Sequence, residues 1–195
     1  MMRVLILLAL LAGSVPAFAA APEAGVPDLR QLMQRFSEVR RSTAYFSEHK
    51  RLAMLNEPLD SSGTLAYVAP DKLQKNTLLP KPERVAVDGD KLTIEQSGEP
   101  GSRTVSLRDA PELGAFVESI RATLAGDLPA LQRHYNVTVE GSLEAWQMTL
   151  EPKERRLREM VKWIRITGRD ASIRSIDSEE ADGDRSEMTI VETGR

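Results

Sequence analysis

The residue types that most often perform catalysis or bind metals are sparse in this sequence. Its two histidines, His49 and His134, lie far apart in the chain, so a metal site built on both would need an added carboxylate and a geometry that their spacing does not indicate. No serine stands in the Gly-x-Ser-x-Gly turn that exposes the nucleophile of many hydrolases. The sequence also contains no cysteine, which excludes thiol chemistry and thiolate metal sites. We therefore expect a protein that is not an enzyme and that has neither a cofactor nor a bound metal.

One acidic segment could bind a hard cation. Glu179, Glu180, Asp182 and Asp184 crowd around Gly183, and clustered carboxylate oxygens are the ligands that Ca²⁺ prefers. The spacing of a calcium-binding EF-hand loop is absent, however, and a glycine among acidic residues is typical of a hairpin turn. We expect an ordinary turn here.

One basic segment, 153–158, could contact anionic lipid headgroups or an acidic partner. Such a run is more often a solvated loop, and the other basic residues are scattered. With a formal net charge of −3, the sequence gives no reason to expect binding to nucleic acid.

The first nineteen residues have the order of a bacterial secretory signal peptide. A basic start ends at Arg3, the leucine-rich run Val4–Ala12 follows, and Ala17 and Ala19 form a small-residue cleavage site. The apolar run has about half of the roughly 20 residues needed to cross a bilayer, which favours cleavage after Ala19 over membrane anchoring. The remaining segment, 20–195, has the size of a single domain. We expect it to be soluble in the periplasm, with no transmembrane segment and no lipid-bearing cysteine.

The hydrophobic pattern of the remaining chain predicts one helix followed mainly by strands. Asp28 can cap a helix whose apolar residues, from Leu29 to Val39, recur every three or four positions. From Arg41 the period changes to two, which predicts a long strand. Two amphipathic helical stretches, 111–125 and 127–135, come later. Further strand-like segments are 63–68, 73–79, 84–87, 92–96, 104–107, 136–140, 144–150, 161–167, 172–179 and 186–192.

These segments predict a mainly β fold with some α-helix. About eleven strands are expected, and a turn at Gly89 should join two of them as a hairpin. Trp146, Met148 and Leu150 alternate with polar residues, so one face of the sheet is apolar. A curved antiparallel sheet with a few helices against that face follows from this pattern. The apolar face could hold an apolar ligand or could simply form a closed core, and the pattern favours neither.

Three motifs in the same order resemble the LolA family of periplasmic lipoprotein carriers. The clearest runs from Gly63 through Pro70 and Pro80 to the turn at Gly89. Before it, a helix leads into a strand that begins with aromatic residues. After it, WIRITGRDASIRSIDSEEADGDRSEMTI is similar to the late strands, glycine turn and Asp-Gly hairpin of that family. Together the motifs cover nearly all of the chain beyond the signal peptide.

This resemblance implies an incomplete β-barrel covered by lid helices, with an apolar cavity for the acyl chains of a lipoprotein. It implies loading by an inner-membrane transporter, delivery to an outer-membrane acceptor, and no cofactor or catalysis. Ala69 stands where the family commonly has an arginine that holds the lid, so we expect Arg51 or another cation to do so here. An aryl-polyene-type lipid product is an alternative cargo.

We predict that the cavity is lined from the apolar sheet face and the lid helices. A different class of function is also open, namely a periplasmic module with a filled core that binds a protein partner through an edge strand or near Arg155. The predicted cargo-binding residues are Leu32, Phe36, Phe46, Leu65, Tyr67, Leu73, Val85, Val87, Ile94, Phe116, Ile120, Trp146, Met148 and Trp163.

Overall fold

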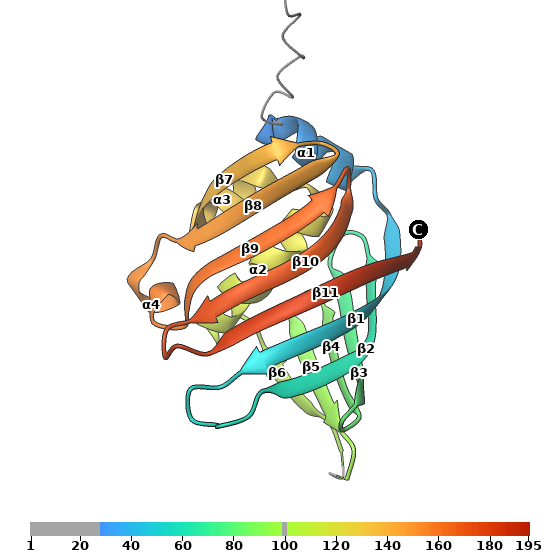
Figure 1. Ribbon diagram of the computed structural model, residues 1–195, viewed down its shortest axis with the longest axis vertical. Helices are drawn as coiled ribbons and strands as arrows, with labels where there is room; N and C mark the ends of the chain where they lie inside the picture. Colours follow the sequence, from blue (N-terminus) through green and yellow to red (C-terminus); the bar gives the residue numbers. More distant parts are fainter. Residues whose placement is uncertain (1–27, 99–100) are drawn as a thin grey trace, which may run out of the picture.

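A computed structural model describes residues 28–98 and 101–195 of the chain. The expected signal peptide, residues 1–19, lies outside the described residues. Within them, one strongly curved antiparallel sheet bends around a layer of helices that lies on its concave side (Figure 1). This arrangement confirms the predicted fold class, a mainly β protein with one sheet that does not close into a barrel.

The sheet has eleven strands in the order β6-β5-β4-β3-β2-β1-β11-β10-β9-β8-β7. Consecutive strands pair in antiparallel fashion apart from β6 and β7, which lie at the two edges, and at the centre the first strand pairs with the last and so joins the two halves. The expected hairpin at Gly89 is confirmed, with Asp88 opposite Lys91. The strands are β1 Arg41–Arg51, β2 Leu59–Val68, β3 Lys72–Leu79, β4 Glu83–Asp88, β5 Lys91–Gln96, β6 Arg103–Ser106, β7 Tyr135–Ser142, β8 Ala145–Pro152, β9 Val161–Arg169, β10 Ser172–Glu180 and β11 Arg185–Gly194.

Four helices accompany the sheet: α1 Leu29–Ser37, α2 Pro111–Ala125, α3 Leu128–His134 and α4 Arg155–Arg158. The predicted cap of the first helix is confirmed, because the Asp28 side chain accepts a hydrogen bond from the Arg30 backbone N–H. Helix α2 ends at Gly126, whose φ of 69° suits a residue without Cβ. The basic run 153–158, expected as a loop, includes the short helix α4, since Leu157 is buried in the core.

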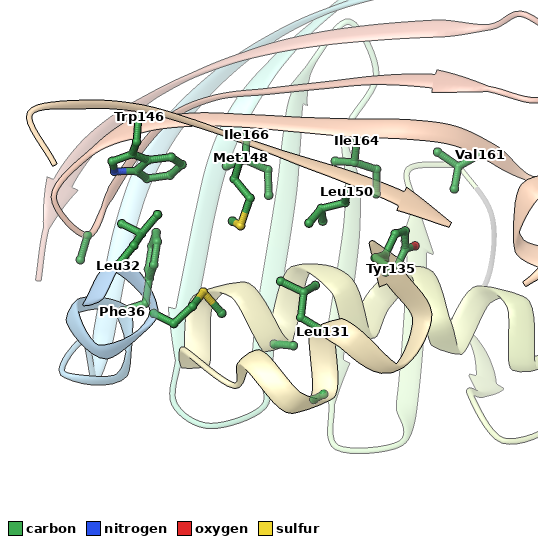
Figure 2. Packing of buried hydrophobic residues seen from close by; sticks show 14 of the residues in the cluster. Leu32, Phe36, Leu131, Tyr135, Trp146, Met148, Leu150, Val161, Ile164 and Ile166 are labelled. Carbon is green, nitrogen blue, oxygen red and sulfur yellow. The ribbon is translucent and has the colours of Figure 1, made fainter. Parts of the chain in front are cut away.

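One half of the concave face is filled by side chains. Trp146, Met148 and Leu150 of β8 point toward Leu32 and Phe36 of α1 and toward α3 (Figure 2). The rings of Phe36 and Trp146 meet edge to face, with centroids 5.8 Å apart. The Trp146 indole N–H donates to the Asp170 carbonyl at 2.8 Å, so its polar atom is satisfied despite burial. This half is a closed core.

A smaller apolar cluster closes the far end of the other half. Val87 and Leu92 of the β4–β5 hairpin pack with Leu107 and with Val117 of α2. Between this cluster and the main core, α2 crosses the concave face without filling all of the space beneath it. The sheet therefore has one filled half and one partly open half.

Gly168 gives a direct test of the packing in the filled half. It lies opposite Trp146 in the β8–β9 pairing, and a Cβ built there would lie 2.2 Å from Cζ2 of the indole and 2.4 Å from the Ser172 carbonyl oxygen. We expect Gly168→Ala to destabilise the fold by about 1–3 kcal/mol through overpacking. Thermal unfolding would then show a drop in Tm of about 2–4 °C for each kcal/mol.

The matched control is Gly194→Ala near the end of β11, where the added Cβ would lie 3.2 Å from the Thr43 hydroxyl, an atom of a movable side chain. Its Tm should stay close to that of the wild type. Equal Tm values for both variants would contradict the packing described here.

Candidate functional site: an apolar cavity under helix α2

A cavity of about 490 Å³ lies between the sheet and α2. Its size falls within the roughly 300–1,000 Å³ of typical small-molecule sites. Strands β1 to β5, β10 and β11 form its floor, and α1 and α2 contribute its remaining walls. A larger hollow of about 610 Å³ lies at β7, β8 and β9 around Glu140 and Arg169, but it is a shallow surface depression. The enclosed space under α2 is therefore the candidate site.

Strand alternation produces the apolar floor. Successive side chains of a strand point to opposite faces, so every second residue of β2, β3 and β4 faces the helices. These positions hold Leu65, Tyr67, Leu73, Val85 and Val87, which all line the cavity. Tyr67, Leu73 and Val87 pair in one row across the three strands, whereas Lys75 stands between Leu65 and Val85 in the next row.

Helix α2 is the lid. Its residues that line the cavity recur at helical spacing and so form one stripe that faces the sheet. A cation of the same helix also fixes its position, because Nη1 of Arg121 donates to the Gly89 carbonyl oxygen at 3.1 Å and the guanidinium pairs with Glu118. Arg121 thus connects α2 to the β4–β5 turn. At the position where the resemblance leads us to expect an arginine that holds the lid, this chain has Ala69. The lining residues of α2 are Leu113, Phe116, Val117, Ile120 and Leu124.

The structure brings together eight of the fourteen predicted cargo-binding residues on the cavity wall, and their contact with cargo stays a prediction. The predicted residues that line the cavity are Phe36, Leu65, Tyr67, Leu73, Val85, Val87, Phe116 and Ile120, whereas Leu32, Phe46, Ile94, Trp146, Met148 and Trp163 do not line it.

The six other residues lie elsewhere for identifiable reasons. Leu32, Trp146 and Met148 belong to the filled core, and Ile94 packs against the smaller apolar cluster. Phe46 is 4% exposed. Its ring lies 4.8 Å below the Lys75 ammonium.

Trp163 occupies the opposite face of its strand from Ile164 and Ile166, where Arg165 stacks over the indole at 4.9 Å. Residue composition does not distinguish the filled half of the sheet face from the open half. In β9 apolar residues occur on both faces of the strand, so the sequence does not show toward which face Trp163 points.

Sequence reasoning missed the charged residues of the site. Glu48, Lys50, Lys75 and Glu180 line one end of the same cavity. The alternation after Phe46 was a usable signal, since Glu48 and Lys50 continue the inward-facing series of β1. They were overlooked because both faces of that strand are mixed in polarity.

The Glu48 carboxylate is the centre of this charged end, and its side chain is only 14% exposed. It accepts hydrogen bonds from Lys75 at 2.5 Å, from Ser186 at 2.7 Å and from Ser61 at 3.3 Å. Burial by itself would raise the pKa of Glu48, but the hydrogen bonds and the Lys75 charge outweigh it and lower the pKa below its usual value. The carboxylate is therefore ionised at neutral pH.

A second ion pair stands beside the first. Lys50 donates to Glu180 at 2.7 Å, and although burial alone would lower the pKa of Lys50, this contact raises it. The acidic turn continues from here: carboxylate oxygens of Glu180, Asp182 and Asp184 lie within 4.8 Å of one another. Asp182 accepts from the Asp184 backbone, and Asp184 accepts from the Ala53 backbone, as in an ordinary turn that anchors the β1–β2 loop.

Neither histidine lines the cavity. His49 contacts Asp60 at 2.7 Å, and His134 contacts Glu154 at 2.8 Å. Among the described residues, neither histidine belongs to a group of three or more side chains placed to hold a metal ion.

The chain belongs to a family of carriers. A family model described as "Outer membrane lipoprotein carrier protein LolA-like" matches residues 19–193, which confirms the resemblance seen in the motifs. No curated protein matches the sequence. Family membership supports lipoprotein or lipid carriage as the kind of function, because members of this family are carriers rather than enzymes.

Several solved structures resemble this chain in fold. The LolA superfamily protein NE2245 from Nitrosomonas europaea has a TM-score of 0.47 and 8% identity, with 86% of this chain and 93% of that chain covered. A DUF1329 family protein from Desulfovibrio piger has a TM-score of 0.45 and 10% identity, with 84% of this chain and 89% of that chain covered. A chain of the MucA/MucB complex of Pseudomonas aeruginosa has a TM-score of 0.45 and 11% identity, with 86% of this chain and 58% of that chain covered. At such identities the likeness concerns the fold alone.

The lowered pKa of Glu48 predicts a specific pH dependence. A carboxyl group with a lowered native pKa stabilises the fold above its unfolded-state value, near 4.5, and loses that contribution as the pH falls through the native pKa. We expect Glu48→Gln to be less stable than the wild type at neutral pH. The difference should shrink steadily below pH 4.5. Urea unfolding of both proteins across this range measures it.

The exposed Glu57 supplies the control, since Glu57→Gln changes the same charge outside the cavity. Its unfolding free energy should follow that of the wild type at every pH. A difference between wild type and Glu48→Gln that stays constant into the acid range would contradict an ionised, partnered Glu48.

Proposed function

We propose that this protein is a periplasmic carrier that shields the acyl chains of a lipoprotein or another lipid-like cargo during transfer from the inner to the outer membrane. The observation that supports the proposal is the largely apolar cavity between the open half of the sheet and α2. A filled core would need no such space. Membership of the LolA-like carrier family supports the same conclusion.

The physical reason for a carrier is the cost of exposing acyl chains to water. Each methylene removed from water contributes about 0.8 kcal/mol, so a long chain in the aqueous periplasm needs an apolar enclosure. A preformed cavity provides it without covalent chemistry or a cofactor. Release then requires that α2 move away from the sheet, and the contact between Arg121 and Gly89 is the polar link that must break.

The cellular setting follows from the same proposal. Residues 1–19 would direct export to the periplasm, and residues 20–195 would form one carrier domain. In the described part of the chain, no helix is long and apolar enough to cross a membrane. Cargo would pass from an inner-membrane donor transporter to an outer-membrane acceptor protein. An aryl-polyene-type lipid product is the alternative cargo, and it would use the same cavity.

A protein-interaction module remains the competing function, and cargo analysis separates it from a carrier. Native mass spectrometry of the mature protein, purified gently from a bacterial periplasm, should show a stoichiometric acylated species. Organic extraction then identifies that species as lipoprotein or pigment lipid. A protein that is empty and also fails to take up a fluorescent fatty-acyl probe would contradict the carrier and favour the module.

The lid helix provides the mutational test. Ile120 faces the cavity, so Ile120→Glu places an uncompensated charge where an acyl chain would lie. We expect this variant to bind the fluorescent fatty-acyl probe at least about tenfold more weakly, which is a loss of about 1.4 kcal/mol. Fluorescence titration measures the change, and circular dichroism checks the fold.

Gln132→Glu is the matched control because it adds the same side chain at an exposed position of α3. It should bind the probe like the wild type. If Ile120→Glu folds and retains full affinity, the cavity under α2 does not hold the acyl chain.

A further inference from the structure

The cavity is mostly apolar, and the lysines that line it, Lys50 and Lys75, lie toward one end, whereas Ser42 and Glu192 line the opposite end. In four strands one inward-facing side chain is apolar and the next, toward the lysine end, is polar or charged, and the position of the change shifts obliquely from β3 through β1 to β11 and β10. This end lies toward the β1–β2 loop, because β1 runs in that direction. The changes are Phe46 to Glu48 in β1, Leu73 to Lys75 in β3, Ile176 to Ser178 in β10 and Met188 to Ser186 in β11.

Strand pairing and side-chain contacts bring these polar residues together. Ser186 pairs with Lys50 on one side and with Ser178 on the other. Lys75 reaches Glu48 across β2, and Ser61 of that strand also donates to Glu48. The result is an oblique polar band. Lys50, Ser186 and Ser178 form a paired row, and Glu48 and Lys75 join it through side-chain contacts although their paired neighbours include Met188, Leu65 and Val85.

The hydrogen bonds of this band leave donors in excess. Glu48 accepts three hydrogen bonds, which nearly fills a carboxylate. A lysine ammonium has three N–H donors, and in the described parts of the chain Lys75 and Lys50 each donate to one carboxylate. Both lysine side chains are about one-third exposed, and both line the cavity. A group with acceptor oxygens can therefore use the remaining N–H donors of Lys75 and Lys50, beside the carboxylates of Glu48 and Glu180 that line the same end.

We propose that this end of the cavity binds the head of the cargo, and that the head carries anionic or carbonyl oxygens which accept hydrogen bonds from Lys75 and Lys50. This inference rests on the proposed carrier function and specifies the cargo as an amphiphile with a fixed orientation. Its acyl chain lies against Tyr67, Leu73, Val87 and the α2 residues, and its oxygen-bearing head lies at the polar band. Fatty acids, phospholipids and acyl esters share this chemistry.

Three ligands of equal chain length test the proposal: dodecanoic acid, dodecanol and dodecylamine. Each competes with a bound fluorescent fatty-acyl probe in a displacement titration at neutral pH. Wild-type protein should bind the acid about tenfold more tightly than the alcohol, the change expected for one hydrogen bond between charged groups. The amine should bind most weakly.

Lys75→Met should remove the preference for the acid and leave the affinity for the alcohol unchanged. The double variant Glu48→Gln/Lys75→Met should show the same loss of preference for the acid. This variant leaves no unpaired Glu48 carboxylate in the cavity, so it can be tested if Lys75→Met alone unfolds. The matched control is Lys72→Met. Lys72 lies on the same strand but pairs with the exposed Asp88 outside the cavity, so this variant should keep the full preference.

The outcomes separate this inference from the carrier proposal. If wild-type protein binds the acid and the alcohol equally, or if the preference for the acid survives in both variants that lack Lys75, the head site is refuted while the carrier stands. If neither the probe nor any of the three ligands binds wild-type protein, both proposals are refuted.

Discussion

The structure depends on one constraint, which is that the concave face of a single open sheet must be covered. Eleven strands present inward-facing side chains on one continuous surface, because the first and last strands pair at its centre. Four helices supply the cover. They fill the half built from β7 to β9, and the helix over the other half leaves a space of about 490 Å³ that β10 and β11 also line. A core and a cavity thus share one sheet, and the filled half stabilises the fold that the open half needs.

Charge in the cavity is placed where burial costs least. Glu48 and Lys75 lie at one end, partner each other and receive further hydrogen bonds from serine side chains. The rest of the wall is mostly apolar, with Ser42 and Glu192 as polar residues toward the opposite end.

The lid shows how the same fold can be kept with different contacts. This chain has Ala69 where the resemblance leads us to expect an arginine. Arg121 of α2 donates a hydrogen bond to the Gly89 carbonyl oxygen. The cation therefore lies on the helix and its acceptor lies on the sheet, whereas an arginine at position 69 would lie on the sheet side. One exchangeable hydrogen bond to a turn is a modest restraint, worth roughly 0.5–1.5 kcal/mol in a typical case.

The sequence by itself determined the fold class, the helix cap at Asp28, the hairpin at Gly89 and the family, because these follow from local turn chemistry, from hydrophobic periods and from the order of motifs. It also indicated eight residues that line the cavity, since alternation fixes the face of a clear strand. Only the tertiary structure decided that Trp146 and Met148 belong to a filled core, that Trp163 faces away from the helices, and that Glu48 and Lys75 enter the cavity. The physical reason is that strand order and sheet curvature bring together residues far apart in the chain, and these long-range contacts decide whether an apolar face is filled or left open.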